Sequence, residues 1–98
     1  MTVTKAAKEK LKSRLLRLKT GSESRTTIRL IPAPKKPGKW KMIWDKERPK
    51  DQVVESEDGI KILLVGADLV RAIEGMVVDF RTTSQGTGFA IYKLRSTT

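Results

Sequence analysis

Residues 51–65 read DQVVESEDGIKILLV and carry the clearest local signal in the sequence. Two strand-like runs, Gln52 to Glu57 and Ile60 to Val65, flank the dipeptide Asp58-Gly59. Asp-Gly between two such runs is typical of a β-hairpin with a type I′ turn, because glycine readily adopts the positive φ angle that this turn requires. We therefore expect an antiparallel pair of strands in the middle of the chain.

The segment after this hairpin predicts one short helix and two more strands. Gly66 to Glu74 fits a helix, with Gly75 as its C-terminal cap. Met76 to Thr82 and Phe89 to Leu94 are rich in β-branched and aromatic residues and predict strands. Glycine and polar residues between them, at positions 84–88, predict a turn.

The segment before the hairpin predicts a basic helix over about residues 4–20, with Thr4 as its N-cap. One apolar stripe at helical spacing should pack on a sheet. It consists of Ala7, Leu11, Leu15 and Leu18. Strands are expected at Thr26 to Ile31 and at Lys39 to Asp45, separated by a proline-rich loop. The whole chain, residues 1–98, is then one α+β domain with six to seven short strands in small mixed sheets.

The composition excludes several kinds of chemistry, since none of the 98 residues is cysteine or histidine. The usual iron–sulfur and zinc ligands and the commonest general base are therefore absent. We expect no catalytic residue, no metal site, no cofactor and a protein that is not an enzyme. An enzyme is the third interpretation, and it would need a cleft with a perturbed lysine or carboxylate, which the sequence does not mark. The carboxylates Glu55, Glu57 and Asp58 are predicted to form a solvated hairpin tip, and Asp79 to make a structural ion pair or a backbone hydrogen bond.

The formal net charge of +10 is concentrated in the first half of the chain. Residues 1–50 carry +12 and residues 51–98 carry −2. Such asymmetry indicates an anionic partner or simply a soluble basic protein. The candidate anion-binding residues are Lys10, Arg14, Arg17, Lys35, Lys36, Lys39 and Lys41. No apolar run is long enough to span a membrane, so we expect a cytoplasmic location.

Two interpretations apply to the tryptophans of the second predicted strand. Trp40 and Trp44 are core residues, or they form with the neighbouring lysines and Arg48 a stacking platform for single-stranded nucleic acid. The chain has only five aromatic residues, which favours the core for both indoles.

The order of residues from position 51 onward resembles the HesB/IscA family, the A-type iron–sulfur carriers. The resemblance rests on Asp51-x-Val53-Val54-Glu55-x-x-Asp58-Gly59-Ile60-Lys61-Ile62, on Leu69, Ile73 and Gly75, on Val78-Asp79-Phe80, and on Gly88-Phe89-x-Ile91. The opening Val3-Thr4-x-Ala6-Ala7-x-x-x-Leu11 is similar to the family's N-terminal helix. The resemblance spans nearly the whole chain and is weakest over residues 32–50. It implies a HesB-like fold in which Asp79 and Gly59 have structural roles.

The family's cluster ligands are missing from this sequence. The first ligand cysteine of the family lies in a Gly-Cys-Ser-Gly-like turn, where this chain has Lys35-Lys36-Pro37-Gly38 with Lys36 in place of the cysteine. The family's Cys-Gly-Cys pair would follow Ile91, and residues 92–98 do not contain it. The resemblance therefore implies the frame of a cluster carrier without its cluster.

Two functions follow from these observations. The first is a binding or adaptor domain, related to iron–sulfur biogenesis, that does not hold a cluster and acts on a protein partner. The alternative is a nucleic-acid or polyanion-binding protein that uses the basic half. Oligomeric state stays open, since edge strands of small α+β domains often pair.

Overall fold

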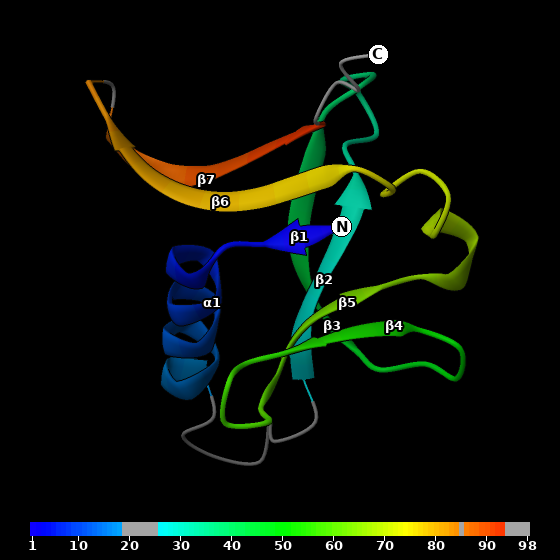
Figure 1. Cartoon of the computed structure of the whole chain (residues 1–98). Coiled ribbons are helices and arrows are strands. Elements are labelled where there is room, and N and C mark those ends of the chain that lie inside the picture. Colours follow the sequence, from blue (N-terminus) through cyan, green and yellow to red (C-terminus); the bar gives the residue numbers. More distant parts are fainter. Residues whose placement is uncertain (19–25, 85, 94–98) are drawn as a thin grey trace.

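Two β-sheets, one α-helix and one short 3₁₀ helix make up the computed structural model, which describes residues 1–18, 26–84 and 86–93. The four-stranded sheet has the order β3-β2-β5-β4 and the three-stranded sheet the order β1-β6-β7 (Figure 1). The elements are β1 (Thr2–Val3), α1 (Lys5–Leu18), β2 (Thr26–Pro32), β3 (Trp40–Lys46), β4 (Gln52–Glu55), β5 (Lys61–Val65), the 3₁₀ helix η1 (Ala67–Leu69), β6 (Met76–Thr83) and β7 (Gly86–Lys93). This arrangement confirms the predicted α+β class.

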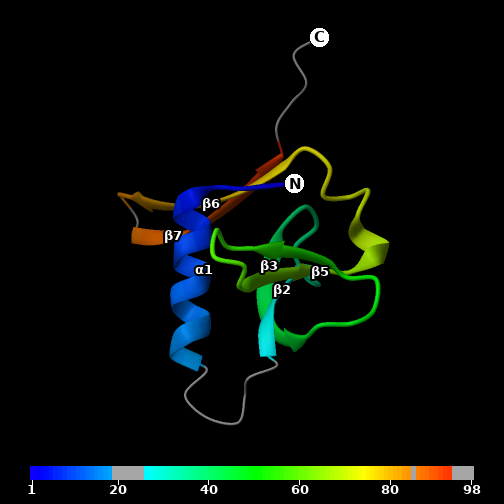
Figure 2. The same cartoon turned by 60° about the horizontal axis from the view of Figure 1, so that its bottom comes forward.

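Helix α1 packs against both sheets through the predicted apolar stripe. Ala7, Leu11 and Leu15 are fully buried, in contact with a core that β2, β5 and β6 also supply. Two views of the molecule place α1 along one side of the four-stranded sheet, with the β6–β7 hairpin across its N-terminal end (Figures 1 and 2). The predicted helix end at residues 19–20 lies outside the described residues. The side chain of Leu18, the fourth residue of the predicted stripe, lies outside the described part as well. In the described residues, no helix is long and apolar enough to cross a bilayer.

Strand β2 is one of the two inner strands of the larger sheet. It pairs antiparallel with β3 and parallel with β5, and every residue from Thr26 to Leu30 is buried. Ile28 and Leu30 point to the α1 side, where they join the hydrophobic core. Arg29 points to the opposite face of the sheet.

The predicted central hairpin forms, but its strands are shorter, Gln52–Glu55 and Lys61–Val65, and its turn is of a different type. Gly59 has a φ of +82°, whereas Asp58 keeps a negative φ, so a type I′ turn is excluded. The N–H of Gly59 donates to the carbonyl of Ser56 over 3.0 Å, and the N–H of Ser56 donates to the carbonyl of Ile60 over 2.8 Å. The result is a type I turn followed by glycine in the left-handed region. The Ser56 hydroxyl accepts a hydrogen bond from the Ile60 N–H, and this contact stabilises the turn that includes Gly59 as its extra residue.

The predicted helix over Gly66 to Glu74 is wrong in length. Only the three residues of η1 form a 3₁₀ helix, and turns follow up to β6. Ile73 is buried at 2% exposure and Leu69 packs against the core while only partly buried, whereas Val70 is 42% exposed. So small an apolar face does not stabilise two helical turns, because most helical stability in proteins comes from packing of such a face. Gly75, the predicted cap, does have a positive φ of 74°.

The three-stranded sheet contains one strand that the sequence pattern does not indicate. Residues of β1 pair in parallel with β6, Thr2 opposite Val77 and Val3 opposite Val78. Strand β7 begins at Gly86 rather than at Phe89, because the antiparallel register with β6 continues to the pair of Thr83 with Gly86. The predicted end of this strand, residue 94, lies outside the described residues.

Candidate functional site

The loop between β2 and β3 is a compact, hydrogen-bonded hairpin tip. The N–H of Ala33 donates to the carbonyl of Lys39 over 2.9 Å, and the N–H of Lys36 donates to the carbonyl of Ala33 over 3.3 Å. Lys36-Pro37-Gly38-Lys39 closes as a type II turn, because the Lys39 N–H bonds the Lys36 carbonyl over 3.0 Å and Gly38 has a φ of +79°. Proline fixes the φ angle at the second position of this turn, and glycine adopts without strain the positive φ that the third position requires.

Four of the predicted anion-binding residues meet at this tip. These four residues are Lys35, Lys36, Lys39 and Lys41. Together with Ala33, Pro34 and Trp40 they line one open hollow of about 590 Å³. All four lysines are exposed. In the described ranges, no carboxylate lies within ion-pair distance of any of them. The sequence contains no acidic residue between Glu23 and Asp45, which accounts for this uncompensated positive surface.

The other three candidates lie on α1 and form a separate group. The ammonium group of Lys10 sits 5.3 Å from the ring centre of Phe80, and the guanidinium of Arg14 sits 5.0 Å from that of Phe89. The two rings contact each other edge to face at 5.0 Å. Lys10 and Arg14 therefore cover the outer end of the core with cation–π contacts. Arg17 is exposed and lines a different hollow on the helix, so the structure does not bring the seven candidates into one site.

The two tryptophans have different environments, so the prediction of a core position for both is half right. Trp40 is half-buried and packs against the hydrophobic core while also lining the lysine hollow. Trp44 is 48% exposed, beside Arg14 in a small cleft of about 70 Å³. Arg48 does not join either indole's hollow; its guanidinium donates to Asp45 over 3.2 Å.

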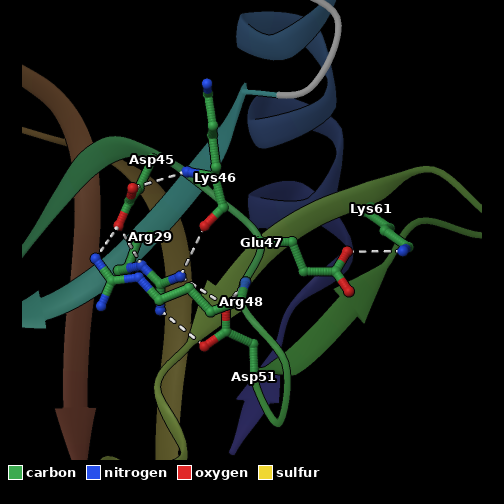
Figure 3. Close-up of polar contacts among 7 residues, drawn as sticks. All are labelled: Arg29, Asp45, Lys46, Glu47, Arg48, Asp51 and Lys61. Carbon is green, nitrogen blue, oxygen red and sulfur yellow. Dashed lines mark hydrogen bonds and ion pairs between the residues drawn. The ribbon is translucent and has the colours of Figure 1, made fainter.

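Arg29 organises a buried ion network that the sequence analysis did not identify (Figure 3). Its two terminal nitrogens bond the two carboxylate oxygens of Asp51 over 3.0 and 2.6 Å, and its Nε bonds Asp45 over 2.7 Å. One of these nitrogens also donates to the Lys46 carbonyl over 3.0 Å. The side chains of Arg29 and Asp51 are only 5% and 3% exposed. The network thus fixes the loop from β3 to β4 against the outer face of β2.

The ion pairs of this network move the pKa values of their members apart. The hydrogen bonds that Arg29 donates to Asp51 raise the pKa of Arg29 above its ordinary value. Those from Arg29 lower the pKa of Asp51, and the backbone N–H of Lys46, followed by Arg29, lowers that of Asp45. A charged residue between Ile28 and Leu30 in a β-branched run was the available signal, because a buried charge must be paired.

Asp79 has the structural role that the sequence predicts. Its Oδ2 accepts from Arg81 over 2.7 Å, and its Oδ1 accepts from the Thr4 hydroxyl over 2.6 Å and from the Phe80 N–H over 2.9 Å. These hydrogen bonds, that from Arg81 first, lower the pKa of Asp79 to about 2. Asp79 therefore ties β6 to the start of α1.

The carboxylates of the central hairpin tip do not form a metal site. Asp58 pairs with Lys12 of α1, and this contact, followed by the Ser56 hydroxyl, lowers the pKa of Asp58 to about 2. Glu55 and Glu57 are exposed. Across residues 1–18, 26–84 and 86–93, no group of three or more acidic side chains is placed to hold a metal ion.

Comparison with known proteins places the fold. No protein-family model matches the sequence, and no curated protein matches it. The structure is similar to that of Escherichia coli SufA, which is involved in biosynthesis of iron–sulfur clusters, with a TM-score of 0.65 and 20% identity over 94% of this chain and 78% of SufA. IscA with the [2Fe–2S] cluster gives a TM-score of 0.61 and 19% identity over 93% of this chain and 79% of IscA. The chain has a HesB/IscA-like fold.

This HesB/IscA-like fold confirms the architecture that the sequence resemblance implied, but the residues present do not fit a cluster. Thiolates, with imidazoles in some proteins, hold iron–sulfur clusters. None of the 98 residues supplies either group. Lys36, which the resemblance places at the first ligand position, is an exposed residue of the β2–β3 tip.

Proposed function

We propose that this protein is a non-enzymatic binding domain that uses the frame of an iron–sulfur carrier without carrying a cluster. The observation that carries the proposal is the combination of a HesB/IscA-like fold with a sequence free of cysteine and histidine. An ammonium group cannot replace a thiolate as a ligand, because it has no free electron pair. In this proposal the protein works in the cytoplasm, and a link to iron–sulfur biogenesis runs through contact with a protein partner.

The distribution of perturbed charges supports a non-enzymatic role. The carboxylates with lowered pKa values are Asp45, Asp51, Asp58 and Asp79, and each makes an ion pair with an Arg or Lys. A general acid or base would instead need a pKa near the operating pH. The four aspartates therefore suit structural ion pairs between elements of the fold and do not suit proton transfer.

Anaerobic reconstitution with iron and sulfide tests the cluster-free proposal. We expect the treated and desalted protein to stay colourless and to hold no stoichiometric iron, whereas IscA treated in parallel should acquire its [2Fe–2S] absorption. A stable chromophore with stoichiometric iron in this protein would contradict the proposal. The measurement is independent of any binding partner.

A second candidate function is polyanion binding through the basic half of the chain. The gathering of Lys35, Lys36, Lys39 and Lys41 around one hollow favours it, since uncompensated lysines attract phosphate groups. Binding to RNA, single-stranded DNA or double-stranded DNA should then appear at low salt and fall steeply as salt is added. Absence of binding to all three at low salt would exclude this candidate. Native co-purification, read for both protein and nucleic acid, would separate the two functions.

A further inference from the structure

The hollow at the β2–β3 tip combines two kinds of surface. Pro34, Ala33 and the indole of Trp40 provide apolar area, and the four lysines supply positive charge around it. Because Trp40 is half-buried and packs on the core, its ring is held in place rather than free to turn. A ligand that fits both surfaces needs a flat apolar part and a nearby anionic part.

The tip is also organised before any ligand binds. Three backbone hydrogen bonds of 2.9 to 3.3 Å close it, and the proline–glycine turn restricts its backbone further. The register of β2 with β3 continues to the pair of Pro32 with Trp40, so the indole emerges where the sheet meets the turn. Little backbone ordering is therefore needed on binding, which favours affinity.

We infer that this tip is a binding site for single-stranded nucleic acid, in which an unpaired base stacks on Trp40 and the flanking phosphates lie against the lysines. The inference rests on the polyanion-binding candidate and names its ligand. An unpaired nucleotide has both required parts, a flat base and a phosphate. An acidic peptide carries its charge on flexible stems without a flat ring, and a duplex keeps its bases stacked inside, so neither uses the indole.

The placement of the second tryptophan fits a path along β3. Trp40 and Trp44 lie on the same face of the strand, four residues apart, which is about 13 Å at the usual rise per residue. Arg14, whose guanidinium lies over the ring of Phe89, also lines the cleft of Trp44. The base on Trp40 is the essential contact of the proposal, and Trp44 is its internal comparison.

Tryptophan fluorescence tests the site, because these two are the chain's only tryptophans. Trp44→Phe leaves Trp40 as the only tryptophan, and Trp40→Phe leaves Trp44. Each variant is titrated at low salt with oligothymidylate of about 12 nucleotides, within the usual site size of such proteins. Inorganic polyphosphate of matched charge is the ligand without bases, and a duplex of the same length is the paired control. Circular dichroism confirms that each variant is folded.

The lysines are tested by their contribution to salt dependence. Lys35→Gln with Lys36→Gln removes two charges from the tip. Lys5→Gln with Arg71→Gln removes two exposed charges elsewhere that make no ion pair with any residue the structure describes. Each phosphate contact to a single strand contributes about 0.7 to the slope of log K against log salt. We expect the tip variant to flatten the slope by about 1.4 and the control to leave it unchanged.

Oligothymidylate should quench Trp40 strongly and Trp44 less, polyphosphate should bind without quenching, and the duplex should bind more weakly than the single strand. Equal quenching by polyphosphate, quenching confined to Trp44, tighter duplex binding, or an equal slope for the tip variant and the control variant would overturn the proposal. If neither oligothymidylate nor polyphosphate binds, both this site and the polyanion candidate fail, whereas the cluster-free proposal is still decided by reconstitution alone.

Discussion

The hydroxyl of Thr4 donates a 2.6 Å hydrogen bond to Oδ1 of Asp79, a residue 75 positions later in the chain. The same hydroxyl oxygen accepts from the Ala7 N–H over 3.2 Å and so caps α1. The Thr4 N–H donates to the carbonyl of Val78 over 2.9 Å. One residue therefore ends the short strand β1, begins the helix and connects both to β6.

Replacing Thr4 tests this connection. Thr4→Ala removes the cap and one hydrogen bond to Asp79, and we expect it to lower the free energy of unfolding by about 1 kcal/mol or more. Thr4→Ser retains the hydroxyl and should stay close to the wild type. Urea denaturation followed by circular dichroism measures both. Equal stability of the alanine and serine variants would mean that the hydroxyl has no role in stability.

The pH dependence of stability should carry a contribution from Asp79. Its pKa in the folded protein, about 2, is below the ordinary value of 3.8, so the folded state binds the proton less readily than the unfolded state. The ionised carboxylate therefore stabilises the fold above about pH 5, and this stabilisation is lost as the pH falls toward 2. Asp79→Asn should be less stable than the wild type at pH 7, and the difference should shrink as the pH approaches 2.

Denaturation measured at several pH values checks this expectation. Glu74→Gln, at an exposed residue that makes no ion pair within the described part of the chain, is the matched control and should follow the wild type. A difference between wild type and Asp79→Asn that is the same at pH 7 and pH 2 would contradict the linkage argument, since a purely steric effect of the amide does not titrate.

The Arg29 network should be the most sensitive polar feature of the fold. Arg29→Met leaves the carboxylate of Asp51, 3% exposed, without its partner, and breaking a buried pair in this way costs about 3–5 kcal/mol. Arg29→Lys should restore little of this, because an ammonium group cannot make the bidentate contact. Arg48→Gln, at a side chain that is 69% exposed, should cost less than about 1 kcal/mol.

Thermal and urea unfolding of these three variants give the comparison. If Arg29→Met were as stable as Arg48→Gln, the network would not hold the loop between β3 and β4. Adding Asp51→Leu to Arg29→Met should recover part of the loss, because the uncompensated buried charge is then removed.

The features that could be predicted from sequence are those fixed by neighbouring residues. The helix cap at Thr4, the stripe of Ala7, Leu11 and Leu15, and the hairpin around Gly59 each depend on spacing within a few positions. The strand β1 was missed, because two residues have no pattern and gain their structure from Val77 and Val78.

The candidate site shows the same division. The lysines of the β2–β3 tip could be named, because a proline–glycine turn places near neighbours together. The separation of Lys10 and Arg14 from these lysines could not be predicted. It depends on cation–π contacts with Phe80 of β6 and Phe89 of β7, which lie about 70 residues away in sequence. Buried Arg29 was missed for a related reason: its partners follow in two later segments.

The basic stripe on α1 gives the last prediction. If Lys10, Arg14 and Arg17 all contacted phosphates, replacing them with Gln would flatten the salt slope of single-strand binding by about 2. Because Lys10 and Arg14 are engaged with Phe80 and Phe89, we expect only Arg17 to contribute, and a change of about 0.7. The effects on stability should be the reverse, with Arg14 contributing and Arg17 not. Arg14→Gln should lower the free energy of unfolding by about 0.5–1 kcal/mol, and Arg17→Gln should leave it unchanged. A slope change near 2 without loss of stability would instead make α1 a binding surface in its own right.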